Sequence, residues 1–317
     1  MSLDPQVRSL LDAAEKAGLQ PLWQLTPDQA RAQYLMRVQR MEAKNVPIHK
    51  VEELRIPGPD RPIALRIYSP RERMIGETLP VLVWFHGGGF VIGSLDTHDT
   101  ACRFLSTGAD CIVISVDYRL APEAKFPAAI DDSFAALRWV VFNGADLGID
   151  IGRIAVGGDS AGGNLAAVCA LMARDAGFPV RFQLLIYPCT APEPETASHR
   201  AFADGYLLTR QTITWFYRHY LRSSKDTHDF RYAPLIADDL SSLPPTWLCV
   251  AGFDPLRDEG VQYATRLIEA GNRVTLVNYE GAVHGFFLMQ GGLEIARRAV
   301  DDASAALRDG LKKTEET

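Results

Sequence analysis

The chain has 317 residues, 47% of them hydrophobic, which is enough for one large α/β domain with a full core and an insertion. Its formal net charge of −6 argues against nucleic acid or an anionic membrane as a partner. No stretch approaches the ~20 apolar residues of a membrane span, and the N-terminus lacks the apolar segment of a signal peptide. We therefore expect a cytoplasmic protein that neither spans a membrane nor binds nucleic acid.

The first elements predicted along the chain are helices. The apolar residues of the first recur at helical spacing, at Val7, Leu10, Leu11 and Ala14. A second helix is predicted from Thr26, because Pro27 suits its first position and Gln29 completes a capping box with Thr26. The apolar positions of the second helix are Tyr34, Leu35, Val38 and Met41.

From residue 51 the pattern changes to strands. Residues 51–56 and 63–68 alternate loosely and predict an antiparallel pair. Nearly continuous apolar runs follow, at residues 81–85, 112–116, 153–157, 184–187, 247–251 and 274–277. Such runs are typical of strands that helices cover on both faces of a mostly parallel sheet. Helical segments, including residues 128–142 and 260–270, alternate with them, so the sequence predicts a doubly wound α/β fold.

One region, between residues 187 and 247, interrupts this alternation because it contains no predicted strand. A proline-rich segment, residues 188–194, leads into a predicted helix over residues 209–221 with several aromatic side chains. We interpret this region as an insertion folded over the C-terminal edge of the sheet and joined there by the N-terminal helices. The alternative is a peripheral helix whose aromatic residues belong to the core.

The five cysteines lie far apart, and no two form a C-x-x-C pair, so neither a zinc site nor a dense disulfide framework is expected. Cys111, Cys169 and Cys249 lie in apolar runs and are predicted to be reduced core residues.

A serine motif lies between the predicted strand at residues 153–157 and a predicted helix at residues 164–173. It reads Gly158-Asp159-Ser160-Ala161-Gly162 and fits G-x-S-x-G, the pattern of a nucleophilic serine on a sharp strand-to-helix turn. The turn crowds backbone against backbone, which requires small neighbours such as Gly158 and Gly162. The alternative is a glycine-rich turn with an incidental serine, so the partners of Ser160 decide its role.

A glycine-rich loop follows the strand at residues 81–85 and reads His86-Gly87-Gly88-Gly89-Phe90. It matches the H-G-G-G element whose backbone N–H groups help to bind the oxyanion in lipases and esterases. The remaining donor is expected to be the N–H of Ala161, the residue after the serine. A merely flexible loop is the alternative, and His86 is expected to be structural.

His284, just after the last predicted strand, is the predicted general base. The remaining histidines are at positions 49, 199, 219 and 228, in polar or helical segments or at strand starts, and at position 98, at a predicted helix start near the site. Asp254, at the end of the strand before Pro255, is expected to orient His284. Asp258 and Glu259 are alternative candidates for this role. They are instead expected to cap the next helix, whose first turn favours acidic residues.

The order Ser160, Asp254, His284 is that of the triad in α/β-hydrolases. Over residues 65–287 the chain resembles the hormone-sensitive lipase-like esterases, also called bacterial lipolytic family IV. The matching segments are residues 86–90, 117–123, 158–164, 254–259 and 284–286. Aspartate at position 159 resembles the subgroup with an acidic residue before the nucleophile.

The resemblance implies an α/β-hydrolase fold with a helical cap formed by residues 1–48 and 189–232, over a catalytic domain of residues 49–188 and 233–317. It implies hydrolysis of short- to medium-chain acyl esters, small molecules, without a cofactor or metal. Gly88 and Gly89 would join Ala161 in the oxyanion hole. The cap residues expected to shape the substrate pocket are Tyr206, Leu207, Leu208, Ile213 and Phe216. Dimers are common in the family, here through the edge strand at residues 273–279, although a covered edge is an equal alternative.

Two other functions stay open from the sequence. One is a non-catalytic ligand-binding protein on the same fold, which the presence of His284 disfavours. The other keeps the triad and changes the bond, to an amide or a thioester, because leaving-group preference depends on pocket geometry.

Overall fold

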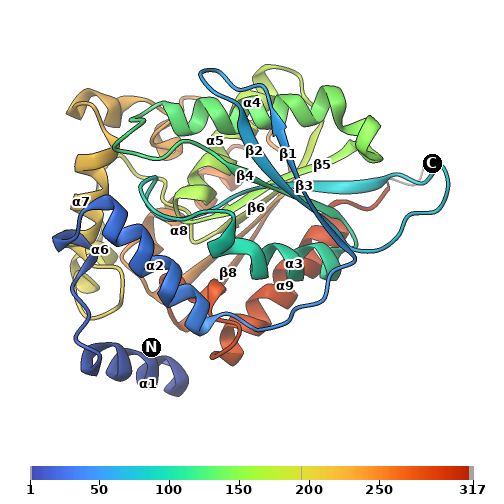
Figure 1. Cartoon of the computed structure of the whole chain (residues 1–317). Helices are drawn as coiled ribbons and strands as arrows, with labels where there is room; N and C mark the ends of the chain where they lie inside the picture. The colour runs from blue at the N-terminus through green and yellow to red at the C-terminus, as the bar shows by residue number, and fades with distance from the viewer. Residues whose placement is uncertain (1, 194, 314–317) are drawn as a thin grey trace.

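The fold is built around one eight-stranded sheet, seen edge-on among its helices in a computed structural model that describes residues 2–193 and 195–313 (Figure 1). The strands lie in the order β1-β2-β4-β3-β5-β6-β7-β8. Their bounds are β1 (Lys50–Ile56), β2 (Ile63–Ser69), β3 (Leu79–Phe85), β4 (Ile112–Asp117), β5 (Ile149–Asp159), β6 (Val180–Ile186), β7 (Thr246–Phe253) and β8 (Val274–Val283). β1 pairs with β2, and β2 with β4, in antiparallel register, and the remaining pairs are parallel. The predicted mostly parallel α/β sheet and its antiparallel hairpin are confirmed.

Helices cover both faces of the sheet, as its continuous apolar strands require. One face packs against α4 (Ala128–Asn143), α5 (Ala161–Asp175) and α8 (Arg257–Glu269), and the other against α3 (Asp99–Ala109) and α9 (Glu294–Gly310). Alternate residues of β3 divide between the two cores: Val83 and Phe85 belong to the first, and Leu82 and Trp84 to the second. Short 3₁₀ helices link the larger elements: η1 (Leu22–Gln24), η2 (Asp96–His98), η3 (Gly144–Leu147), η4 (Ser224–His228), η5 (Pro234–Ile236) and η6 (Phe286–Leu288).

The N-terminal helices are α1 (Pro5–Lys16) and α2 (Pro27–Met41). The capping box predicted at the start of α2 is present, because the Thr26 hydroxyl accepts from the Gln29 N–H while the Gln29 side chain accepts from the Thr26 N–H. Few residues of these helices are buried: Val7 in α1, and Ala30 and Val38 in α2. Both helices therefore pack against the rest of the protein through narrow apolar stripes.

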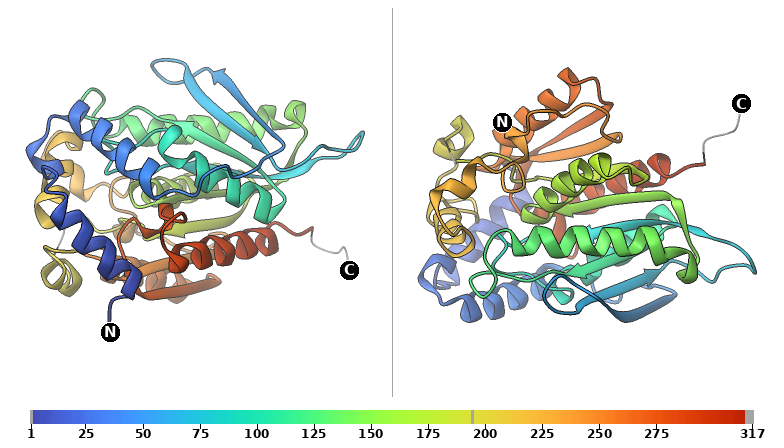
Figure 2. Two further views of the ribbon diagram at one scale, coloured as in Figure 1. Left: turned by 60° about the horizontal axis from the view of Figure 1, so that its bottom comes forward. Right: turned by 90° about the horizontal axis from the view of Figure 1, so that it is seen from above.

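The region between β6 and β7 contains two further helices, α6 (Ala197–Ala201) and α7 (Arg210–Tyr220), and no strand among its described residues. The two views of Figure 2 and the view of Figure 1 agree that α1, α2, α6 and α7 gather at one end of the molecule. At that end β5, β7 and β8 reach their carboxyl ends, which is where the predicted site residues follow them in sequence.

β5 and β8 extend furthest beyond their predicted ranges. β5 begins at Ile149 instead of residue 153, and β8 continues to Val283, where it pairs with Phe253 of β7. Gly281 lies in this extension of β8 and allows close packing, because a side chain there would press on Asp4. Because β8 continues to Val283, His284 directly follows the end of this strand.

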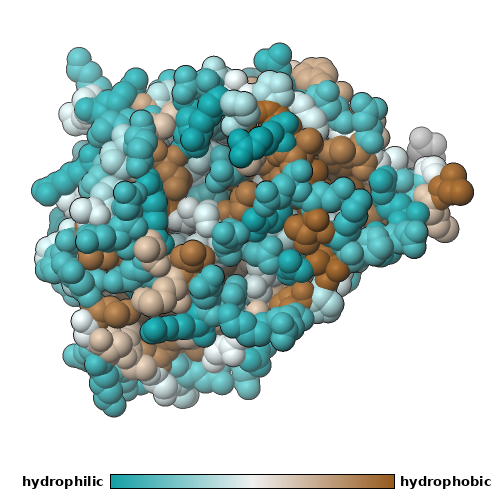
Figure 3. All heavy atoms as spheres, viewed as in Figure 1, coloured by the Kyte–Doolittle hydropathy of each residue, from teal (hydrophilic) through white to brown (hydrophobic). Residues whose placement is uncertain are grey.

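The outside of the molecule is largely hydrophilic in the view of Figure 3, with hydrophobic residues in small groups. Within the described ranges, no helix is both long enough and apolar enough to cross a membrane.

Candidate active site

Ser160 lies on a sharp turn between the end of β5 and the first residue of α5. Its backbone has φ 54° and ψ −118°, a conformation that a non-glycine residue adopts only when its surroundings enforce it. A side chain at Gly162 would overlap the carbonyl group of Phe85 in the neighbouring strand, and one at Gly158 would overlap Gly162 itself. The glycines of the motif thus allow the close packing that holds Ser160 in its strained turn.

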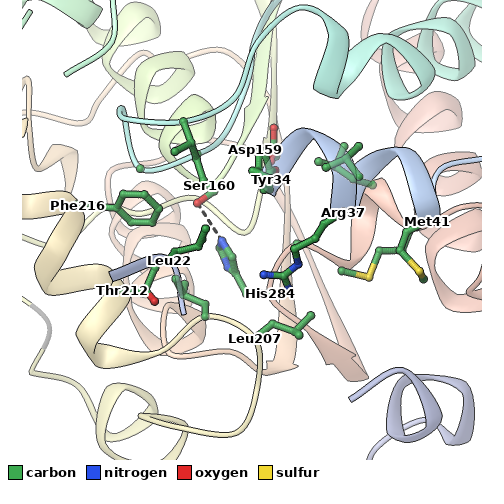
Figure 4. A pocket seen from close by; sticks show the side chains of 18 of the residues that line it. Leu22, Tyr34, Arg37, Met41, Asp159, Ser160, Leu207, Thr212, Phe216 and His284 are labelled. Atoms are coloured by element: carbon green, nitrogen blue, oxygen red, sulfur yellow. Dashed lines mark hydrogen bonds between the residues drawn. The ribbon is translucent and has the colours of Figure 1, made fainter. Parts of the chain in front are cut away.

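His284 lies between Ser160 and Asp254, and Figure 4 shows its contact with Ser160. His284 Nε2 is 2.9 Å from Ser160 Oγ, and His284 Nδ1 is 2.7 Å from Asp254 Oδ2. Asp254 is fully buried at the end of β7, and its other oxygen accepts the N–H of Leu256 at 2.8 Å. The ring of Tyr187 lies against His284, with 4.7 Å between ring centroids. The three residues predicted from the sequence therefore meet in hydrogen-bonding geometry.

The glycine-rich loop passes beside Ser160, where Gly88 and Gly89 have positive φ angles of 122° and 58°. Their N–H groups donate to no acceptor within the described part of the chain. The N–H of Ala161 starts helix α5, and the first N–H groups of a helix have no intrahelical partner. A side chain at Gly89 would overlap the ring of Phe216. The loop thus brings unpaired donors into a space that only glycine leaves open.

A buried contact between Asp159 and His98 holds this loop against the serine turn. Asp159 Oδ1 accepts the N–H of Gly87 at 2.9 Å and lies 3.0 Å from His98 Nε2. The far nitrogen of His98 lies 2.8 Å from the Thr97 hydroxyl, and the side chains of Asp159 and His98 are almost completely buried. Burial by itself opposes the charge on Asp159, but His98 and the Gly87 N–H outweigh it and hold the pKa of Asp159 below its usual value. The sequence predicted His98 near the site and missed this pairing.

His86 is a buried structural residue, as expected. Its ring stacks on Tyr118 with 4.3 Å between centroids, and the Tyr118 hydroxyl donates to the His86 carbonyl at 2.6 Å. Burial, assisted by the nearby His98, lowers the pKa of His86 to about 3. His86 is therefore neutral at physiological pH, and its packing supports the glycine-rich loop.

The two rival acids do not contact His284. Asp258 and Glu259 lie in the first turn of α8, as predicted, but they bind the backbone of the region between β6 and β7. Asp258 accepts the N–H of Ser198 at 2.8 Å. Glu259, fully buried, accepts the N–H of Thr190 at 2.5 Å and lies 3.2 Å from His199 Nε2. These acids fasten the insertion to the catalytic domain, a role that the sequence did not reveal.

A cavity of about 320 Å³ opens above Ser160 and His284. Four of the five predicted pocket residues line it, namely Leu207, Leu208, Ile213 and Phe216. Tyr206, the fifth, points elsewhere: its ring stacks on Phe253 and meets Phe202 edge-on. Its position in sequence gave no sign of this direction, because Tyr206 lies in an irregular segment with no periodicity.

The N-terminal helices, which were expected in the cap, line the same cavity with residues that were not predicted to do so. The contributing residues include Leu10 and Ala14 of α1 and Tyr34, Arg37 and Met41 of α2. Figure 4 shows Arg37 extending from α2 into the space beside His284. The spacing of Tyr34, Val38 and Met41 marked the correct face of α2, and Arg37 lies on that face.

The described residues contain no group of three or more His, Cys, Asp or Glu side chains positioned to hold a metal ion. The predicted core cysteines, Cys111, Cys169 and Cys249, are buried free thiols.

Comparisons with known proteins show which family the chain is similar to. Residues 82–288 match the family described as alpha/beta hydrolase fold. Esterase LipI of Mycobacterium tuberculosis is 47% identical over 268 residues, which are 83% of each chain, and the ethyl acetate hydrolase of Pseudomonas putida is 37% identical over 98% of this chain and 100% of its own length.

A solved structure gives the same result in three dimensions. It is a serine-to-alanine mutant of LAE6, an alpha/beta hydrolase enzyme from the metagenome of Lake Arreo, Spain. It matches with a TM-score of 0.93 at 44% identity and covers 97% of this chain and 98% of that chain. The chain therefore belongs to the hormone-sensitive lipase-like branch of the alpha/beta hydrolase family.

Proposed function

We propose that this carboxylic-ester hydrolase forms a covalent acyl-enzyme on Ser160 and acts on short- to medium-chain acyl esters. The observation that carries the proposal is the unbroken line from Asp254 through His284 to Ser160, with separations of 2.7 and 2.9 Å, below a largely apolar cavity. The relative from Pseudomonas putida is named an ethyl acetate hydrolase, which supports a short acyl group within the accepted range.

In the proposed reaction His284 Nε2 takes the proton of Ser160 as Oγ attacks the ester carbonyl. Asp254 accepts a hydrogen bond from the Nδ1–H of His284, which fixes the tautomer and stabilises the imidazolium. The imidazolium then protonates the departing alcohol. Water attacks the acyl-enzyme by the same route, with His284 again as base, and releases the acid.

The proposed oxyanion hole consists of the N–H groups of Gly88, Gly89 and Ala161. Their free donors and the positive end of α5 favour the negative charge that develops on the carbonyl oxygen. Loss of one such donor typically lowers kcat by about 10²- to 10³-fold.

We further propose that residues 1–48 and 189–232 act as a helical cap over a catalytic domain of residues 49–188 and 233–317. This boundary follows the helices that gather over the cavity, although residues 1, 194 and 314–317 lie outside the described part of the chain. β8 is an edge strand and is the proposed surface for a homodimer. We also propose a cytoplasmic location.

The proposal is tested by Ser160→Ala. We expect kcat to fall by at least ~10⁴-fold on 4-nitrophenyl butyrate, as in other serine hydrolases, with the thermal unfolding midpoint preserved. A matched panel of one acyl group as ester, thioester and amide should show ester as the preferred bond. Near-wild-type turnover in the variant, or faster cleavage of the amide, would contradict the proposed function.

A further inference from the structure

The cavity above Ser160 contains a cation without a protein partner. The guanidinium of Arg37 lines this cavity, and within the described residues it makes neither a hydrogen bond nor an ion pair. Arg31 on the same helix is the opposite case, because it binds both oxygens of Glu123 and the carbonyl of Val91. Arg31 therefore holds α2 to the fold, whereas Arg37 of the same helix faces the cavity.

An unpaired, partly buried guanidinium in this cavity is energetically unfavourable when no ligand is bound. The side chain of Arg37 is only partly exposed, and its burial lowers its pKa, with Tyr34 acting in the opposite direction. A guanidinium nevertheless stays protonated, so its five N–H donors need acceptors that the cavity walls do not supply. An anionic group on a bound molecule would supply them.

The rest of the lining favours an anion as well. Asp159 is the one carboxylate among the described lining residues, and its Oδ1 is engaged by both His98 and the Gly87 N–H. Arg40, exposed at the mouth of the cavity, adds a second positive charge. Tyr34 lies one turn before Arg37 on the same face of α2 and lines the cavity too. Its hydroxyl is a further donor that an anion can use.

We infer that the preferred substrates are esters that carry a carboxylate away from the scissile bond, and that Arg37 binds this carboxylate. The inference rests on the proposed esterase function and narrows its substrate class. A guanidinium and a carboxylate form paired, charge-assisted hydrogen bonds that fix orientation as well as affinity. The carboxylate can belong to the acyl half or to the alcohol half of the ester, and the substrates below separate the two.

Two matched substrate pairs test the inference. In the first, the charge lies on the acyl half: monoethyl glutarate is compared with its neutral primary amide, ethyl glutaramate. In the second, the charge lies on the alcohol half: 4-acetoxybutanoate is compared with 4-acetoxybutanamide. The amide has nearly the shape of the carboxylate and lacks its charge. Hydrolysis is followed at constant pH by titration of the released acid, and the measured quantity is the ratio of kcat/KM for acid and amide.

We expect this ratio to exceed one in at least one pair and to fall by about 10- to 100-fold in Arg37→Gln, the range expected for a lost charge-assisted hydrogen bond. Arg37→Lys should restore part of the ratio, because it keeps the charge and loses the fork-shaped geometry. Arg218→Gln is the matched control, since Arg218 is exposed on α7 outside the cavity lining, and its ratio should equal that of the wild type. Titration of the active serine with an organophosphate verifies that each variant is folded.

The outcomes separate this inference from the esterase proposal. Equal ratios in wild type and Arg37→Gln, or a preference for the amide in both pairs, would overturn the role of Arg37 while leaving ester hydrolysis intact. Failure of the wild type to hydrolyse any of the four esters, or to react with the organophosphate, would instead count against the proposed function itself.

Discussion

The end of the sheet and the helices above it are built in different ways. At the sheet end, Asp254, Asp159 and His98 are buried and each is held by hydrogen bonds at 3.0 Å or less. The helices above contribute mainly apolar contacts, and α1 buries only Val7. A preorganised polar network suits chemistry that is common to many substrates, whereas loosely buried helices can change their lining residues at small cost to the fold.

The largest effect is expected from breaking the network at Asp254. Asp254→Asn keeps the shape but favours the wrong tautomer of His284, so we expect kcat to fall by about 10³- to 10⁴-fold with little change in KM. Steady-state kinetics on 4-nitrophenyl butyrate measures this. Asp258→Asn is the control, because Asp258 binds Ser198 instead of His284 and its variant should keep kcat within a few-fold. Equal losses in the two variants would remove Asp254 from its assigned role.

A smaller loss is expected at Asp159, which acts through the glycine loop. In Asp159→Asn the carboxylate that contacts His98 and the Gly87 N–H is lost, so the glycine loop is held less firmly and the oxyanion donors should be misplaced. We expect kcat to fall about 10- to 100-fold, less than for the loss of a donor itself. Asp301→Asn, an exposed change on α9, serves as control. Unchanged kcat in a variant with the pairing abolished would show that the loop holds its shape without Asp159.

The buried His86 should make stability depend on pH. Its pKa is about 3 in the folded protein and ~6.5 in an unfolded chain, so between these values the unfolded state binds the extra proton. The free energy of unfolding should therefore decrease as the pH falls below about 6.5, with His86 contributing about 1.4 kcal/mol per pH unit. Urea unfolding at pH 7, 6 and 5 should show a shallower slope for His86→Asn, while the exposed His49→Asn keeps the wild-type slope. Identical slopes in all three proteins would contradict this assignment.

The smallest effect concerns the helices above the cavity. The ring of Phe216 lies against Gly89 and lines the cavity, so Phe216→Ala should make room for longer acyl chains. We expect the kcat/KM ratio of decanoate to butyrate 4-nitrophenyl esters to rise about 3- to 10-fold, because one methylene in a pocket carries limited discrimination. Phe202→Ala removes a ring that packs on Tyr206 outside the lining and should leave the ratio unchanged. An unaltered ratio in Phe216→Ala would exclude Phe216 from chain-length selection.

The contrast between the two regions also explains what could be predicted from the sequence. The strands, the capping box at Thr26 and the meeting of Ser160, Asp254 and His284 were predictable, because each has a local pattern that the fold preserves. The pairing of Asp159 with His98 was not, since it joins residues 61 positions apart that carry no shared motif.

The cavity was the least predictable part. Its lining depends on the direction of single side chains, so Tyr206 was assigned to it in error and Arg37 was missed. Arg37 looks like an ordinary solvent-facing arginine in the sequence of an amphipathic helix. Only the packing of α2 over Ser160 turns that face toward the cavity.

The most direct test of the account is to identify the residue that becomes covalently modified during turnover. The enzyme is treated with a fluorophosphonate, its intact mass is measured, and the modified peptide is sequenced by tandem mass spectrometry. The account predicts one adduct per chain, located on Ser160, with activity lost in proportion to labelling, and no adduct in Ser160→Ala. Labelling of a different residue, or full activity in protein completely labelled at Ser160, would contradict it.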